Sequence, residues 1–282
     1  MFGYEDLLKE VDIFNSIGVE TGVVGDSYLK NRIPYIYIGN DKKNCIIVQG
    51  AIHAREHITA LLVLDMAKHL LARKDLILNG GIYFIPMVNV DGVMLAQQGD
   101  TVIKDKQLRK KLLQINGHSD FSLWKANARG VDLNVNFDAN FGSGEQNVFY
   151  PSSQNYVGEY ANSEPETMAL INFTTALRPK ATLSYHTKGE VIYWRFGQTR
   201  TKLWEHYRLA KGIAQNTSYA LAENSRSAGG YKDWCIQKLD IPAFTIEVGK
   251  DSYSHPYPYA DYENLLMINK DIPRKLVNTL NR

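Results

Sequence analysis

The stretch NCIIVQGAIHAREHITALLVLDMAKHLL, residues 44–71, contains an apolar run, a short polar loop and a second, longer apolar segment in direct succession. The first run, residues 45–49, ends at Gly50 and is typical of a buried strand. Residues 55–71 then show helical periodicity, and residues 81–86 return to a strand pattern. This order of strand, helix and strand is typical of an α/β protein.

The same alternation continues to the end of the chain. Residues 5–15 are predicted to be helical, and residues 33–39 and 44–49 are predicted to form a hairpin around the polar turn 40–43. The later predicted elements are helix 164–177, strands 181–185 and 190–194, helices 202–214 and 231–238, strand 243–248 and a closing helix 262–280. We therefore predict one α/β domain over residues 1–282, with a mixed, mostly parallel twisted sheet and helices on both faces. Ligands of such sheets bind at the carboxyl ends of the strands.

Composition and charge exclude several classes of partner. Lys and Arg are spread along a chain of net charge +2, so nothing indicates nucleic acid or an anionic membrane. No apolar run approaches the roughly 20 residues needed to span a bilayer. The N-terminus shows no secretory signal, so a cytoplasmic location is expected. Cys45 and Cys235 are expected to be reduced and buried, because two widely separated cysteines do not form a disulfide framework.

Three side chains follow predicted strands in a way that suits a metal ion. His53 and Glu56 come just after the strand 45–49, and His186 ends the strand 181–185. Imidazole and carboxylate groups are typical ligands of Zn²⁺. A His and a Glu three positions apart also fit the start of a surface helix, and a lone His is often structural. Convergence of all three at one sheet edge nevertheless favours a zinc site.

Glu247 at the end of strand 243–248 is the candidate general base. A carboxylate that activates water must lie near the metal without binding it. An unpaired carboxylate in this position would be costly to bury. The alternative is a structural Glu that pairs with a Lys or Arg of the core.

At this point the sequence resembles the M14 family of zinc carboxypeptidases over nearly its whole length. Five segments carry the resemblance, and they occur in the family's order. They are GAIHARE at 50–56, PMVNVDG at 86–92, GVDLN at 130–134, SYH at 184–186 and FTIE at 244–247. The first and fourth resemble the motifs of the metal ligands, the third resembles the substrate-binding loop, and the fifth resembles the strand of the catalytic glutamate.

The resemblance implies one zinc ion, a peptidase activity and roles for several side chains. Glu247 would take a proton from the attacking water and pass it to the leaving amine. The family's oxyanion-stabilising arginine falls on Lys125, so either Lys125 takes that role or Arg129 reaches in. Both side chains can equally be solvated loop cations. Arg55 and Asn134 lie in matching motifs and are expected to contact the substrate.

The chain departs from the exopeptidase pattern at two positions. The family's loop reads Asn-Arg-Asn, and its arginine grips the substrate's terminal carboxylate, but here the central residue is Val135. The family's mobile tyrosine aligns with Ser225. The removal of single C-terminal residues from ordinary peptides is therefore in doubt.

Lys232 aligns with the floor of the pocket for the residue after the scissile bond. A buried lysine requires an anion, which is either the adjacent Asp233 or a carboxylate of the substrate. Meso-diaminopimelate has such a carboxylate. The segments WKAN at 124–127, HTKGEVIYW at 186–194 and GYKDW at 230–234 also resemble bacterial γ-D-glutamyl-diaminopimelate peptidases of the family.

We therefore expect hydrolysis of the bond between γ-D-Glu and meso-diaminopimelate in cell-wall peptides, with Lys232 or Arg129 binding a diaminopimelate carboxylate. No LysM wall-binding repeat is visible, so a released muropeptide is the expected partner. The alternatives are a conventional metallocarboxypeptidase with another cation in place of the missing arginine, and a zinc-bound, inactive binding module.

Overall fold

The protein is built around one eight-stranded sheet, which a computed structural model describes together with the rest of residues 1–222 and 226–281. The strand order is β1-β2-β4-β3-β5-β8-β6-β7. The strands are β1 Thr21–Asp26, β2 Arg32–Gly39, β3 Cys45–Gln49, β4 Gly81–Ile85, β5 Ala181–Thr187, β6 Val191–Tyr193, β7 Ala220–Ala222 and β8 Ala243–Val248. Pairing is parallel through β4, β3, β5 and β8, and antiparallel where β2 meets β1 and β4 and where β6 meets β8.

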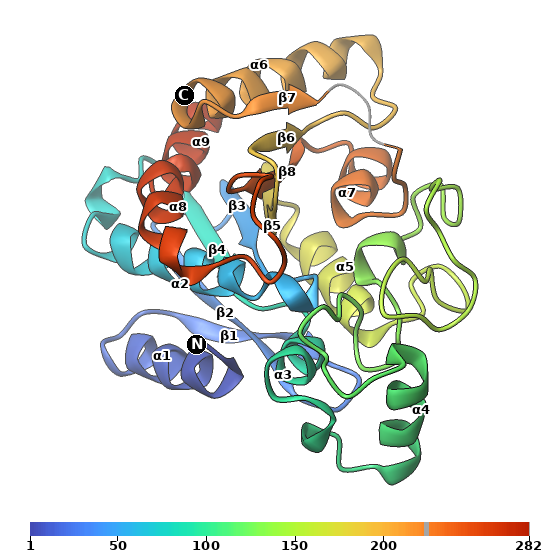
Figure 1. Ribbon diagram of the computed structural model, residues 1–282. Helices are drawn as coiled ribbons and strands as arrows, with labels where there is room; N and C mark the ends of the chain where they lie inside the picture. Colours follow the sequence, from blue (N-terminus) through green and yellow to red (C-terminus); the bar gives the residue numbers. More distant parts are fainter. Residues whose placement is uncertain (223–225, 282) are drawn as a thin grey trace.

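Helices cover both faces of this sheet (Figure 1). They are α1 Tyr4–Ser16, α2 Ile58–Leu71, α3 Val90–Gln98, α4 Lys106–Asn116, α5 Pro165–Leu177, α6 Arg200–Thr217, α7 Tyr231–Leu239, α8 Tyr262–Asn269 and α9 Ile272–Leu280. Figure 1 shows α2, α8 and α9 on one side of the sheet and α5 and α7 on the other. Every residue of β3, β4 and β5 is consequently buried. Strands covered on both faces have near-continuous apolar sequences, which is why their positions were predictable.

The predicted hairpin of residues 33–39 and 44–49 is wrong. Strand β4 lies between β2 and β3, and β2 forms its hairpin with β1 instead. The polar segment that follows β2 does not close a tight turn, because the backbone N–H groups of Asn40 and Asp41 both donate to Gly80 O just before β4. Strand β1 contains Gly22 and Gly25 and is only partly buried, so it lacks the apolar pattern of a core strand.

The predicted closing helix 262–280 is two helices. Helix α8 ends at Asn269, and α9 begins at Ile272 with Pro273 in its first turn. Proline has no backbone N–H and clashes with the preceding turn, so it is tolerated at a helix start and not in a helix interior. The structure also adds α3 and α4, for which the sequence analysis had no prediction.

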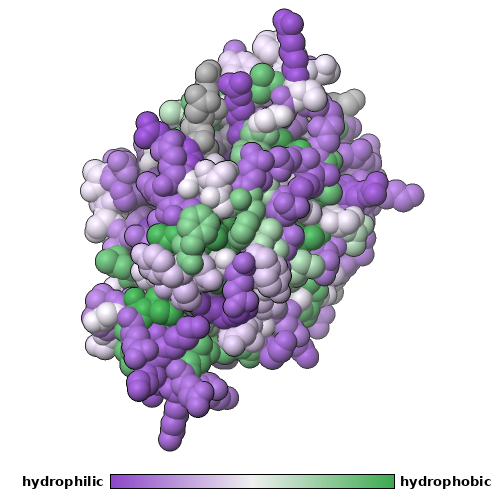
Figure 2. Space-filling view, turned by 90° about the vertical axis from the view of Figure 1, so that its right-hand side faces the viewer, coloured by the Kyte–Doolittle hydropathy of each residue, from purple (hydrophilic) through white to green (hydrophobic). Residues whose placement is uncertain are grey.

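The surface and the two thiols agree with the expected properties. Large exposed hydrophobic residues are scattered along the chain, and on the side shown in Figure 2 hydrophilic side chains surround smaller groups of hydrophobic ones. None of the described helices combines the length and the apolar character that crossing a bilayer requires. Cys45 and Cys235 are free and buried, as predicted.

Candidate active site

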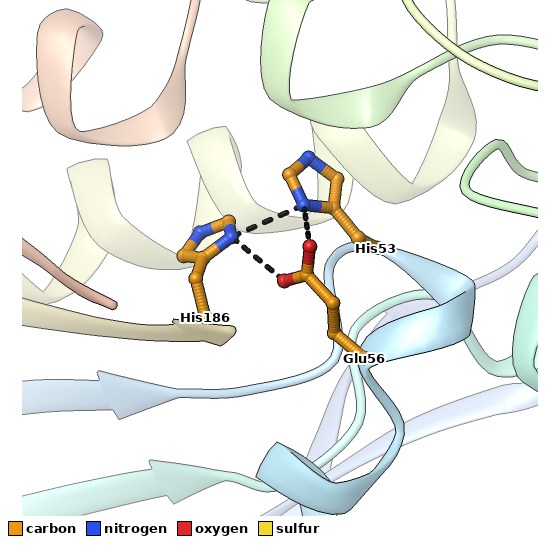
Figure 3. Close-up of side chains that lie close together, drawn as sticks. All are labelled: His53, Glu56 and His186. Carbon is orange, nitrogen blue, oxygen red and sulfur yellow. Dashed lines mark hydrogen bonds and ion pairs between the residues drawn. The ribbon is translucent and has the colours of Figure 1, made fainter. Parts of the chain in front are cut away.

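The three predicted metal ligands meet at the carboxyl edge of the central strands (Figure 3). Strands β3 and β5 are parallel neighbours, so their carboxyl ends lie side by side. The chain leaving β3 brings His53 to this edge and then forms a short 3-10 helix, Ala54–Glu56, that carries Glu56. His186 is the penultimate residue of β5. The loop after β3 and the end of β5 therefore place all three side chains at the same point of the sheet edge.

The three side chains point their donor atoms at one another. His53 Nδ1 lies 2.9 Å from Glu56 Oε1, and His186 Nδ1 lies 3.1 Å from both Glu56 Oε2 and His53 Nδ1. One ligand atom from each residue lies within 4.8 Å of the others, and all three residues are buried. Two imidazole nitrogens that face each other across a carboxylate make a donor set that fits Zn²⁺ and leaves a coordination position open for chemistry.

The carboxylate of this triad is electrostatically prepared for a cation. Burial alone would raise the pKa of Glu56, but His53 and His186 hold that pKa well below its ordinary value. The backbone N–H of Thr187 also donates to Glu56 Oε2 at 3.3 Å. Glu56 is therefore ionised over the working pH range, as a metal ligand must be.

Glu247 lies next to the triad without being part of it. In the register of β5 and β8 it is the direct partner of His186, and its side chain lines a cavity of about 460 Å³. Desolvation raises the pKa of Glu247 to about 7; His186 and Lys125 oppose this rise and Glu56 adds to it. A carboxylate whose pKa lies near neutrality is suited to accepting and returning a proton.

Lys125 is one of the cations that line the cavity, and it is the one linked to a metal ligand. Its Nζ lies 2.7 Å from Asp132 Oδ2, and Asp132 Oδ1 lies 3.3 Å from His53 Nε2. Asp132 is fully buried, so it links a metal ligand to the cavity cation through one carboxylate. A carboxylate behind a metal-binding histidine fixes the orientation of the ring. This role of Asp132 was not predicted from the sequence, although the position of Asp132 in the segment GVDLN was a signal for it.

Arg129 and Arg55 are placed elsewhere. Arg129 lies 3.4 Å from Glu164 and packs over the ring of Tyr28, and it is not among the residues that line the cavity. Arg55 donates to Gln154 Oε1 at 3.2 Å and does not line the cavity either. Lys125 and Arg129 were the two candidates for stabilising the oxyanion. Because Lys125 lines the cavity and Arg129 does not, the geometry favours Lys125.

The predicted substrate loop does reach the cavity. Asn134 and Val135 both line it, and Asn134 Oδ1 accepts a hydrogen bond from Tyr231 N at the start of α7. The 3-10 helix Leu133–Val135 that carries these residues begins at Asp132, whose Oδ1 accepts from Asn134 N. Val135 therefore contributes an apolar side chain to the lining of the cavity.

Lys232 is buried on the wall of the same cavity and is paired with Asp233. Its Nζ also donates to Arg195 O at 3.3 Å and lies 5.3 Å from the centre of the Phe196 ring. The structural pairing that was one of the two predicted alternatives is therefore present. It coexists with a position on the cavity wall, so it does not remove Lys232 from the substrate.

Several lining residues had no prediction. They are Gly144, Gln146, Asn147, Asn155, Tyr193, Arg226, Ser227, Gly230 and Thr245. Most lie in irregular segments, where neither periodicity nor a motif marks them. Ser225, which aligns with the family's mobile tyrosine, lies outside the described residues.

The chain is similar in sequence to known peptidases. A gamma-D-glutamyl-L-diamino acid endopeptidase of Lysinibacillus sphaericus is 33% identical over 256 residues, which are 86% of this chain and 63% of that protein. The chain thus spans less than two thirds of that relative. Bovine carboxypeptidase B2 is 28% identical over 86% of this chain and 61% of its own length.

Solved structures share the fold. Bovine thrombin-activatable fibrinolysis inhibitor superimposes with a TM-score of 0.82 at 21% identity, covering 99% of this chain and 97% of that one. Murein-tripeptide amidase of Escherichia coli O157 gives a TM-score of 0.60 at 19% identity, covering 92% and 91%. The model of the zinc carboxypeptidase family matches residues 4–280. The chain therefore belongs to the zinc carboxypeptidase family, whose members are metallopeptidases that use one zinc ion.

Proposed function

We propose that this metallopeptidase hydrolyses the bond between γ-D-Glu and meso-diaminopimelate in soluble peptides released from peptidoglycan. The observation that carries the proposal is that Val135 and Lys232 line the same cavity. By the family resemblance, Val135 stands in place of the arginine that would bind the terminal carboxylate of an ordinary peptide. Lys232 lies on the cavity wall and offers a cation at another position. The similarity to an endopeptidase named for γ-D-glutamyl-L-diamino acid bonds supports the same substrate class.

Lys232 retains a donor for the substrate although it is paired. An ammonium group has three N–H donors. In this structure one goes to Asp233 and another to Arg195 O, which leaves one for a ligand in the cavity. A carboxylate at the far end of a diaminopimelate side chain would receive this donor as a charge-assisted hydrogen bond. Asp233 keeps the pocket neutral when no substrate is present, which limits the cost of burying the lysine.

The chain's own groups account for the proton transfers of the reaction. Zinc, when bound, polarises the scissile carbonyl and lowers the pKa of water. Glu247 accepts the proton of the attacking water and returns it to the leaving nitrogen, a role that suits a pKa of about 7. Lys125 supplies positive charge toward the oxygen of the tetrahedral intermediate, and Asp132 holds the ammonium in place.

The experiment is to incubate the zinc-loaded protein with L-Ala-γ-D-Glu-meso-diaminopimelate and, in parallel, with hippuryl-Phe and hippuryl-Arg. Mass spectrometry identifies the products. We expect release of diaminopimelate from the tripeptide and no cleavage of the hippuryl peptides. Cleavage of the hippuryl peptides alone would identify a conventional metallocarboxypeptidase, and no cleavage despite bound zinc would favour a binding module.

The variant Lys232→Met tests whether Lys232 binds the distal carboxylate of the substrate. We expect KM for the tripeptide to rise by roughly 10- to 100-fold, because one charge-assisted hydrogen bond is lost. L-Ala-γ-D-Glu-L-Lys has no distal carboxylate and is the matched control, and we expect its KM to be the same in the wild-type protein and in Lys232→Met. Thermal unfolding of the variant separates loss of recognition from loss of fold, since Asp233 is left buried with fewer partners. Unchanged kinetics on the tripeptide would remove Lys232 from the proposal.

A further inference from the structure

The cavity has more than one cation, and their partners differ. Lys125, Lys232 and Arg226 are the Lys and Arg side chains among its described lining residues. Lys125 pairs with Asp132, and Lys232 pairs with Asp233. Both carboxylates are buried, so these two lysines have permanent counter-ions that solvent does not screen.

Arg226 is in a different situation. The ion pair recorded for it within the described residues is with Glu145, at 3.6 Å between Nη1 and Oε2. The two side chains are 85% and 63% exposed. A pair of this kind contributes little, because water screens it and both side chains lose rotamer freedom. Compared with the two lysines, the guanidinium of Arg226 can therefore exchange its present partner for a substrate with a smaller loss of free energy.

The backbone ties Arg226 to a polar loop on the same rim. Glu145 N donates to Arg226 O at 3.1 Å, which joins the segment of Arg226 to residues 144–147. Gly144, Gln146 and Asn147 of this loop also line the cavity. Asn147 Nδ2 is buried and has no hydrogen-bond acceptor within the described part of the chain. A buried amide donor requires an acceptor, and none of the neighbouring described groups supplies one.

We infer that Arg226, together with Asn147 of the tethered loop, recognises the free main-chain carboxylate of the substrate residue on the leaving side of the scissile bond. A carboxylate has two oxygens, so it accepts from the planar guanidinium and from an amide at the same time. Lys232 deeper on the wall is then reserved for a second, distal carboxylate. The inference explains how the site can bind an acidic product end although Val135 occupies the loop position; for the identity of the substrate it rests on the proposed function.

The test compares peptides that differ only in this carboxylate. The substrates are L-Ala-γ-D-Glu-meso-diaminopimelate and its form with the main-chain carboxylate converted to an amide, together with hippuryl-Phe and hippuryl-Phe amide. For the wild-type protein we expect the acid to be preferred over the amide. In Arg226→Ala we expect KM for the acid to rise by roughly 10- to 100-fold, with KM for the amide unchanged, so that the preference disappears.

Two further variants provide controls. Arg208→Ala removes an exposed arginine on α6 that does not line this cavity, and it should leave the KM of both substrates unchanged. Glu145→Gln releases Arg226 from its ion pair and should keep the acid preference. If Arg226 only stabilised the rim through Glu145, Glu145→Gln and Arg226→Ala would instead have the same effect.

The outcomes separate this inference from the proposed function. Equal cleavage of acid and amide by the wild-type protein, or equal loss on both in Arg226→Ala, would overturn the inference even if the tripeptide is a substrate. If only hippuryl-Phe is cleaved, an acid preference that Arg226→Ala abolishes supports the inference while the proposed function fails. If nothing is cleaved, calorimetric binding of free meso-diaminopimelate to the zinc-loaded protein decides, since weaker binding by Arg226→Ala supports the inference and equal binding overturns it.

Discussion

The metal ligands and the residues of the facing cavity wall lie close together but are held in different ways. His53, Glu56 and His186 are fixed by the carboxyl ends of two buried parallel strands, and they bond to one another. Lys125 and Arg226 stand on irregular segments, and loop contacts hold them. The positions of the metal ligands therefore depend on the sheet, whereas the positions of Lys125 and Arg226 depend on loop conformation. We expect substitutions of the metal ligands to abolish the reaction and substitutions of Lys232 or Arg226 to alter its selectivity, whereas Lys125 takes part in the reaction itself.

The largest effect is expected for His186→Ala. Removal of one of three ligands leaves zinc with an incomplete site, so bound zinc and peptidase activity should both be lost. His118→Ala is the matched control, because His118 is exposed on a loop. Metal analysis after gel filtration and activity on the preferred peptide give the readout. Full zinc content in His186→Ala would contradict the assigned ligand set.

Glu247→Gln should separate catalysis from metal binding. The amide cannot accept a proton, so kcat should fall by about 10²- to 10⁴-fold while zinc is retained. Steady-state kinetics and metal analysis on the same preparation test both parts. Unaltered activity would show that another group moves the proton, and lost zinc would show that Glu247 is a ligand.

Glu166, which contacts the loop of Lys125, is expected to make the free energy of unfolding depend on pH. It is buried, accepts from Tyr28 N and bonds to Asn127 in the loop that carries Lys125. Desolvation raises its pKa from 4.5 to about 7. Between these values the folded state holds a proton that the unfolded state has released, so this contribution is complete below pH 4.5 and is lost as the pH rises to 7. The total loss is about 3 kcal/mol.

Urea unfolding at pH 4.5 and at pH 7.5 measures this dependence. Glu166→Gln fixes the group in a neutral form and should make the fall in stability over this window smaller by about 3 kcal/mol, while Glu247, whose pKa is also raised to about 7, continues to contribute. A variant with the same pH profile as the wild-type protein would exclude Glu166 as the source.

Asp132→Asn tests the carboxylate that lies between the metal ligand His53 and the cavity cation Lys125. Loss of charge behind His53 should weaken zinc affinity by about 10- to 100-fold, as found for groups that orient metal ligands. Competition with a zinc chelator gives the affinity directly. An unchanged affinity would mean that Asp132 does not orient His53 and acts through Lys125 and the neighbouring loop instead.

The smallest effect is expected for Arg129→Ala. Its partner Glu164 keeps the hydrogen bonds from Asn127 and Ser163, so unfolding should become easier by no more than about 1 kcal/mol. Kinetic constants should be unchanged because Arg129 does not line the cavity. A marked loss of activity would return Arg129 to the reaction and weaken the role of Lys125.

Much of the fold was predictable because buried strands leave apolar runs in the sequence. Strands β3, β4, β5 and β8 and most helices lie near their predicted positions. The hairpin prediction failed because sequence proximity does not reveal that β4 inserts between β2 and β3. Strand β1 was missed because glycines weaken its pattern, and the break after Asn269 was missed although Pro273 marked it.

For the site, the sequence predicted those residues that strand ends bring together. His53, Glu56, His186 and Glu247 all lie at one sheet edge, and parallel pairing makes that edge inferable. The placement of Arg129 against Glu164, and of Arg226 on the cavity rim, depends on loop conformation, which no periodic pattern encodes. The sequence left two alternatives for Lys232, a structural pair with Asp233 or a contact with the substrate. The structure shows that Lys232 is paired with Asp233 and also lines the cavity.

The pair of Lys232 and Asp233 also constrains how this enzyme can diversify. Asp233 Oδ2 accepts from Gly230 N at the start of α7 while Oδ1 holds the lysine. Loss of Lys232 alone leaves a buried carboxylate, and loss of Asp233 alone removes both a counter-ion and a helix cap. A change in the charge of this wall without loss of stability therefore requires substitution of both neighbours, so Lys232 and Asp233 act as one unit.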